Sequence, residues 1–213
     1  MLKFRDPVST WIHFISAILA AIGLVLLLIL GRANLLQELS LLLYGLTLIL
    51  MFSSSTLYHA AQTSPERLLR LRKLDHSSIY LLIAGSYTPL CIHYFSGFWH
   101  WGFLGIVWAF GLAGILIKMF VIDAPRWVTA GIYLVMGWLS IFAVKEMIQT
   151  MPVAALLWLL AGGLFYTIGA IIYITKKLDF KPGVFGFHEV WHVFVTLGAF
   201  CHFILIALFI AEK

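Results

Sequence analysis

The chain has 213 residues, of which 62% are hydrophobic and only 11% charged, and its net charge is +5. A soluble domain averages about 45–50% apolar and about 25% charged residues, so this composition excludes an ordinary soluble protein and predicts one that lies almost entirely in a bilayer. In such a protein the positive charge does not indicate nucleic-acid binding, and we expect no nucleic-acid partner. Cys91 and Cys201 both fall in apolar segments, where we expect reduced packing residues and no disulfide.

Seven apolar runs are each long enough to cross a membrane as a helix, which takes about 20 residues. They are continuously apolar and do not alternate as the strands of a membrane barrel do. Short segments with charges, glycine or proline separate them. We therefore predict an all-α membrane protein, a single seven-transmembrane-helix bundle that covers residues 1–213. The runs span residues 8–30, 35–60, 76–95, 99–120, 127–148, 152–175 and 186–210.

The distribution of Lys and Arg predicts the orientation of this bundle. Cytoplasmic loops of membrane proteins carry an excess of these residues. With seven crossings, only Arg32, Lys145 and Lys213 lie on the side away from the N-terminus. We therefore expect a cytoplasmic N-terminus and an outer C-terminus. The residues on the N-terminal side are Lys3, Arg5, Arg67, Arg70, Arg72, Lys73, Lys118, Arg126, Lys176, Lys177 and Lys181.

Three polar stretches that are far apart in the sequence arrive at the same membrane depth in this topology. The second run ends with "SSSTLYHA" at residues 53–60. The third begins with "LDHSSIY" at residues 74–80, and the seventh begins with "FHEVWHVF" at residues 187–194. All three lie at the predicted cytoplasmic face. Ionisable residues inside a membrane are energetically expensive and mark functional sites by default.

The histidines of these stretches form a candidate metal site. His188 and His192 are four residues apart, so their imidazoles lie on one helix face, and His59 can approach them from the second run. Three histidines with a water in the fourth position are a ligand set of catalytic zinc. We expect Asp75 to hydrogen-bond that water, and Ser55, four residues before His59, to bond either Asp75 or the water.

Simpler interpretations of these residues remain open. The histidine pair alone is equally compatible with a structural or proton-relay role, and serines in membrane helices commonly bond their own backbone. His76 follows Asp75 but points about 100° away around a helix, and we expect it to face the interface. Glu189 is interpreted as a helix N-terminal charge first and a site residue second. His13 is a candidate for the cavity wall.

The same stretches closely resemble the bacterial hemolysin III family. The stretches of this chain that carry the resemblance are, in order, "SSTLYHA", "DHSSIYLLIAGSYTP" and "HEVWHVFVTLGAFCHF". That family belongs to the progestin and adipoQ receptor group, whose wider superfamily includes alkaline ceramidases and is described as membrane metal-dependent hydrolases. The resemblance implies seven segments with the N-terminus inside. It also implies that His59, His188 and His192 hold zinc and that Asp75 contacts the zinc-bound water, and Ser55 matches the family's serine.

Bacterial members of this family usually open with an acidic residue, an asparagine three positions later and a histidine four positions after that. The matching residues here are Asp6, Ser9 and His13. Since serine replaces the asparagine, the role of this N-terminal motif stays open.

Four functions compete at this point. The leading hypothesis is a zinc-dependent hydrolase of an amide or ester bond in a membrane lipid or lipid-like substrate. The alternative is a membrane sensor or regulator in which zinc is structural. Cytolysis, which the family name suggests, has little support because the sequence contains no amphipathic pore-forming segment. Proton or ion transport is disfavoured because the polar residues gather at one depth. The sequence does not give the substrate or the oligomeric state.

Overall fold

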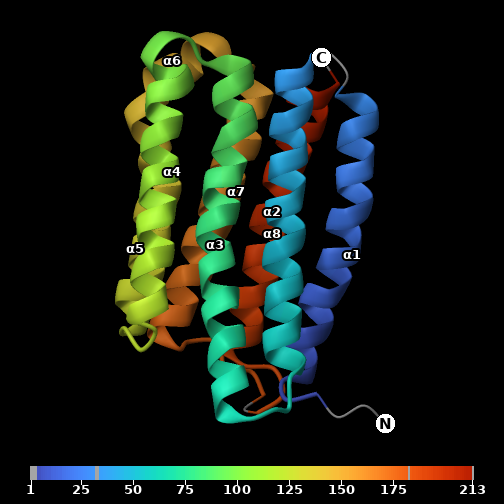
Figure 1. Ribbon diagram of the computed structural model, residues 1–213, viewed down its shortest axis with the longest axis vertical. Coiled ribbons are helices and arrows are strands. Elements are labelled where there is room, and N and C mark those ends of the chain that lie inside the picture. Colours follow the sequence, from blue (N-terminus) through green and yellow to red (C-terminus); the bar gives the residue numbers. More distant parts are fainter. Residues whose placement is uncertain (1–3, 32–33, 182, 213) are drawn as a thin grey trace.

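A computed structural model describes residues 4–31, 34–181 and 183–212, and these residues form a bundle of long helices (Figure 1). Among them there is no strand, only an isolated bridge between Lys181 and Phe185. The prediction of an all-helical protein is therefore confirmed. Lys3, Arg32 and Lys213, which entered the predicted charge bias, lie outside the described residues. The helices are α1 (Pro7–Leu30), α2 (Leu35–Ala60), α3 (Pro65–Tyr94), α4 (Gly97–Phe120), α5 (Arg126–Gly137), α6 (Val144–Thr150), α7 (Val153–Thr175) and α8 (Phe187–Ile206).

Within the described residues, six segments are long and apolar enough to cross a membrane, where the sequence predicted seven. The difference is α3, whose first part is charged and whose apolar part carries several hydroxyl side chains. Nevertheless α3 lies alongside α2 and α4 in the bundle (Figure 1). The six segments are Pro7–Leu30, Leu35–Ala60, Gly97–Phe120, Arg126–Thr150, Val153–Thr175 and Phe187–Ala211.

Helix α3 also begins earlier than predicted, at Pro65 and not near residue 76. The Ser64 side chain accepts a hydrogen bond from the Arg67 N–H, proline occupies the first helical position, and Glu66 lies in the first turn. Each of these features stabilises a helix start. The basic stretch that we expected to be a loop is therefore a helical extension of α3 beyond its apolar part.

The fifth predicted segment is helical but not uniform. Between α5 and α6, residues Trp138–Ala143 form a 3-10 helix. The Tyr87 hydroxyl of α3 enters this break: it donates to the Gly137 carbonyl at 2.6 Å and accepts from the Ser140 N–H at 2.9 Å. A side chain inserted into the backbone ladder is a recognised cause of such irregularity, so the break is explained by tertiary contact and not by local sequence.

Helix α8 packs against helices from both halves of the chain. It packs against α7 and α1 and also touches α3. The contact with α7 depends on Gly169, where an added Cβ would lie 2.7 Å from Cβ of Phe194. Small residues of this kind let helices approach closely inside a membrane. The N- and C-termini lie at opposite ends of the bundle (Figure 1).

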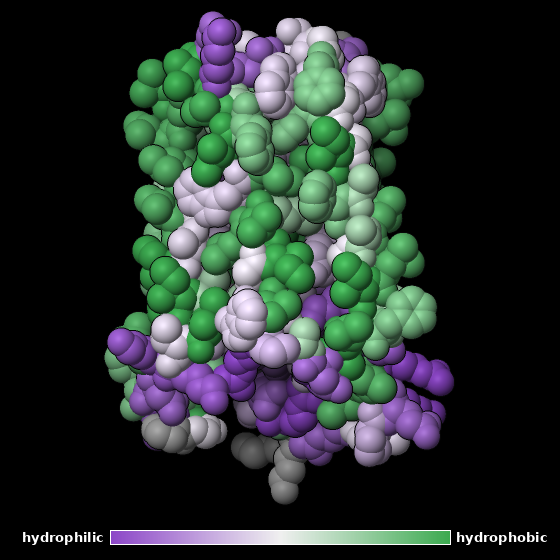
Figure 2. Space-filling model, turned by 90° about the vertical axis from the view of Figure 1, so that its left-hand side faces the viewer, coloured by the Kyte–Doolittle hydropathy of each residue, from purple (hydrophilic) through white to green (hydrophobic). Residues whose placement is uncertain are grey.

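The outer surface of the bundle is apolar. On α1 the exposed side chains include Trp11, Ile15, Leu19 and Ile22, three or four residues apart along one face. Figure 2 shows hydrophobic residues over the height of the bundle and hydrophilic residues concentrated at its lower end. This pattern is the reverse of a soluble helical protein and fits a surface in contact with lipid.

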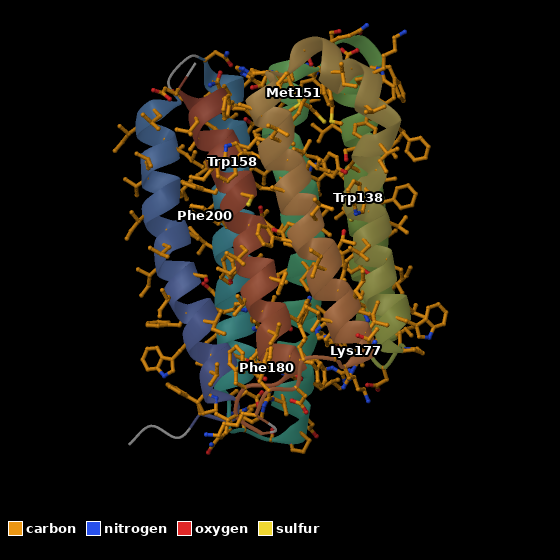
Figure 3. The ribbon with its side chains drawn as sticks, turned by 180° about the vertical axis from the view of Figure 1, so that it is seen from behind. Trp138, Met151, Trp158, Lys177, Phe180 and Phe200 are labelled. Atoms are coloured by element: carbon orange, nitrogen blue, oxygen red, sulfur yellow. The ribbon has the colours of Figure 1, made fainter. Side chains whose placement is uncertain are left out.

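An elongated cavity of about 310 Å³ occupies the interior. Its wall comes from every helix except α4 and is mostly apolar. At the lower end it is lined by His13, Asp75 and His192, and towards the upper end by Met147 and by Met151, which Figure 3 labels. The cavity therefore connects the polar end of the bundle with its apolar middle.

Candidate metal centre

Two helix ends position the histidine cluster. His59 lies in the last turn of α2, and His188 and His192 lie on successive turns at the start of α8. Nε2 of His188 is 3.1 Å from Nε2 of His192 and 3.5 Å from Nε2 of His59. All three offer one ligand atom within 4.8 Å of the others. The structure thus brings together the three histidines that the sequence singled out, close enough to bind a metal ion.

Two of the three spacings between these nitrogens match those of a tetrahedral ion. At Zn–N distances of about 2.0–2.1 Å, two ligand nitrogens on a tetrahedral ion lie about 3.3 Å apart. The two Nε2 distances of 3.1 and 3.5 Å bracket that value. His59 and His192 are buried, at 3% and 1% exposure, so their nitrogens have little access to bulk water. The donor set is therefore suited to a metal that prefers imidazole.

Asp6 supports His59 from the N-terminal end of α1, a contact that the sequence left open. Oδ2 of Asp6 lies 2.9 Å from Nδ1 of His59, and the Asp6 N–H donates to the His59 carbonyl at 3.0 Å. Because an ionised carboxylate only accepts, Nδ1 must carry the proton, which leaves the Nε2 lone pair free for a ligand role. The hydrogen bond to His59, assisted by Arg5, holds the pKa of the Asp6 carboxyl below its usual range.

The first turns of α1 and α8 also meet beside the cluster. Ser9 donates to Oε1 of Glu189 at 3.0 Å, and Oε2 of Glu189 accepts the Gly186 N–H at 2.9 Å. Glu189 thus satisfies the start of its own helix, as expected, and in addition anchors α1. The ring of His13 stacks on that of His192, with centroids 4.0 Å apart and planes 19° apart.

Asp75 and Ser55 are buried and line the cavity, as does His192. Within the described part of the chain, neither side chain is hydrogen-bonded to one of the three cluster histidines. Asp75 instead lies 3.2 Å from Nδ1 of His76. His76 therefore does not turn away to the interface as expected, because its side chain is long enough to fold back over the preceding residue despite the 100° step of the helix.

A neighbouring serine makes the polar link between α2 and α3 that was expected of Ser55. The Ser54 and Ser78 hydroxyls lie 2.8 Å apart, and Ser78 donates to the Asp75 carbonyl at 2.7 Å. Ser54 is thus joined to the backbone of the Asp75 turn, whereas Ser55 faces the cavity. The sequence "SSS" carries no signal that separates these positions, since each is one helical step from the next.

Half-buried His202 lies farther along α8. Its Nε2 is 3.4 Å from the Leu159 carbonyl, and the residue lines the cavity.

Comparison with known proteins shows the family of this chain. The family described as "Haemolysin-III related" matches residues 2–203. The chain is 34% identical to the "Hemolysin-3 homolog" of Bacillus subtilis (strain 168), over 93% of this chain and 92% of that one. It is 35% identical to "Hemolysin-3" of Bacillus cereus, over 93% and 88% of the two chains. The "Adiponectin receptor protein" of Drosophila melanogaster is 27% identical over 92% of this chain but only 48% of its own length. A family match over nearly the whole chain, together with relatives above 30% identity, places this protein in the haemolysin-III related family.

Proposed function

We propose that the protein crosses the bacterial inner membrane seven times and acts as a zinc-dependent hydrolase of amide or ester bonds in lipids. The observation that carries this proposal is the cluster of three imidazoles beside an elongated apolar cavity whose wall also holds the carboxylate of Asp75. A site of this kind combines a metal-binding donor set, a candidate proton acceptor and space for an apolar chain.

The proposed topology counts α3 as the seventh crossing. It packs between α2 and α4, and an odd number of crossings agrees with chain ends at opposite ends of the bundle (Figure 1). The basic extension of α3 and the loop before α8 lie at the end that carries the N-terminus (Figure 1), and the excess of Lys and Arg supports the proposal that this end faces the cytoplasm.

His59, His188 and His192 would hold the ion. A zinc ion with three imidazole ligands keeps one position open and supplies a Lewis acid and a water of lowered pKa. Zinc is favoured because a neutral three-imidazole set suits it better than magnesium or calcium, which prefer oxygen ligands.

The remaining roles fall to residues of the cavity wall. The buried Asp75 carboxylate would orient water at the cavity end and accept its proton, and Ser55 on the same wall would hydrogen-bond the polar part of the substrate. Small-molecule sites enclose about 300–1,000 Å³, so the cavity of about 310 Å³ can take a single slender chain. Its apolar wall would exclude bulk water from the bond to be cleaved.

The test is metal analysis followed by lipid hydrolysis with the purified full-length protein in detergent. We expect one zinc per chain and release of fatty acid from at least one member of a panel of ceramides, phospholipids and acylglycerols. Asp75→Asn should retain zinc and lose turnover by about 10²–10⁴-fold, the contribution of a positioned acid–base group. Stoichiometric zinc without hydrolysis of any panel lipid, in a well-folded preparation, would refute the enzymatic proposal.

A second candidate function is a membrane sensor or regulator in which the metal ties helices together. It is favoured by two observations: His59 and His188 are absent from the cavity wall of the described residues, and the Asp75 carboxylate pairs with His76. A closed site of this type is characteristic of structural zinc. It would be supported by a protein whose thermal stability depends on zinc and in which Asp75→Asn has the same stability and phenotype as wild type.

A further inference from the structure

We infer that the start of α1 is a positioning element for the metal centre. Asp6 fixes the tautomer and orientation of the His59 ring, while Ser9 and His13 fix the first turns of α8. The inference rests on the metal-binding part of the proposed function. It concerns residues that do not bind the ion themselves and whose role the sequence left open.

The geometry at Asp6 differs from that of an ordinary helix start. Asp6 is the residue before α1, where an aspartate side chain normally accepts a backbone N–H of the first turn. Its carboxylate makes no such bond in the described part of the chain. It is directed to Nδ1 of His59 instead, and the Asp6 N–H donates to the carbonyl of the same residue. The side chain thus makes no helix cap, and the residue is held to His59 by two hydrogen bonds, one from its side chain and one from its backbone.

Arg5 holds this carboxylate in position. Its Nε donates to Oδ2 of Asp6 at 3.0 Å, the same oxygen that faces His59. The guanidinium also lies over the ring of Tyr58, 4.3 Å from its centroid. Because Tyr58 precedes His59 on α2, the carboxylate is clamped between two groups anchored beside the cluster. A charged acceptor fixes the tautomer of a ligating histidine and makes its other nitrogen a stronger donor to the metal.

Ser9 and His13 extend this support to α8. Ser9 is fully buried and donates to Glu189, the residue after His188. His13, also buried, stacks flat against His192 and so restricts rotation of that ring. Ser9 and His13 are four residues apart, on one face of α1. A single helix start therefore contacts the surroundings of all three cluster histidines, which come from two other helices.

The experiment compares zinc affinities of full-length, detergent-purified variants by competition with a chromophoric chelator. Asp6→Ala should bind zinc about 10–100-fold more weakly than wild type, the usual effect of losing such a partner of a ligand. Asp6→Asn, which keeps the shape and a neutral acceptor, should lie between the two. Asp123→Asn is the matched control, since Asp123 also pairs with an arginine, Arg72, at 2.7 Å but contacts no histidine in the described residues.

A second readout separates positioning from general stability. The visible absorption bands of Co²⁺-loaded protein should shift in both Asp6 variants and stay at the wild-type positions in Asp123→Asn. If wild type binds zinc while both Asp6 variants bind it within twofold of wild type and keep the Co²⁺ spectrum, the inference is overturned and the proposed function stands. If wild type itself binds no zinc, the proposed function and this inference fail together. Should Asp6→Ala fail to fold, Asp6→Asn and Ser9→Ala carry the comparison.

Discussion

Removal of the metal should loosen the bundle in a way that depends on His192. The histidine cluster joins the end of α2 to the start of α8, and these two helices make few direct contacts with each other. A ligand that binds only the folded state adds stability that grows with its concentration, about 2.7 kcal/mol when the free ligand is 100 times its dissociation constant. The cluster exists only when both helices are in place, so this stabilisation applies to the folded bundle alone.

The expected size follows from the length of the chain. For 150–250 residues, 1 kcal/mol shifts a melting temperature by about 2–4 °C, so chelation should lower that of wild type by about 5–10 °C. The assay is a thermal melt of detergent-purified protein with excess zinc and with excess chelator. His192→Ala should melt at the same temperature in both conditions, because it lacks one of the three nitrogens.

His202→Ala is the matched control for this experiment. His202 is a half-buried histidine of the same helix that lines the cavity and faces the Leu159 carbonyl, outside the cluster. It should lower stability in both conditions yet keep the full zinc-dependent shift. The reasoning would be refuted if His192→Ala retained the zinc-dependent shift, or if His202→Ala lost it.

Two further predictions concern the bundle that holds the site. Gly169→Val should cost about 1–3 kcal/mol, because its side chain would press on Phe194 and force α7 and α8 apart, whereas Gly131→Ala, where nothing lies within 4 Å, should leave the melting temperature unchanged. Tyr87→Phe should cost about 1–3 kcal/mol, because it leaves the backbone groups at the break in the fifth segment without their partner. Both are measured as thermal or denaturant unfolding in detergent, and a Gly169→Val variant as stable as wild type would contradict the close approach of these helices.

The cluster of three histidines was predictable because two strong constraints act on it. A four-residue spacing puts His188 and His192 on one helix face, and the number of crossings sets the depth of His59. The prediction of that depth used hydropathy and charge and no packing detail. Asp75 and Ser55 were placed at the cavity by the same argument, but depth says nothing about which hydrogen bonds a side chain makes.

The rotational details could not be predicted for this reason. Ser54 and Ser55 differ by one helical step, and only packing decides which of them meets Ser78. His76 folds back to Asp75, a rotamer choice that the sequence leaves open. The early start of α3, in contrast, had a local signal: Ser64 followed by proline and glutamate is a helix start, and the charge of the next residues concealed it.

Asp6 was left open although its depth was available. Helices α1 and α2 cross the bundle in opposite directions, so α2 ends on the side where α1 begins, and a residue just before α1 lies near the depth of His59. Ser9 replaces the asparagine of the family's N-terminal motif, so the sequence alone assigned the motif no role. The first residue of the motif, Asp6, nevertheless contacts His59. Residues just outside a membrane helix lie at the same depth as ligands at the ends of neighbouring helices, and can therefore hydrogen-bond to them.

The arrangement also explains why enzymatic and regulatory functions are difficult to separate in this fold. The cluster lies where the polar end of the bundle meets an apolar cavity, and its ligands come from α2 and α8 with support from α1. Any ion bound there must stabilise the contacts among these helices, whether or not turnover occurs. Stability therefore reports binding, and only Asp75 distinguishes the functions. A hydrolase requires this carboxylate to accept a proton at the end of the cavity that it lines, whereas a regulator is complete with the Asp75–His76 pair as it stands.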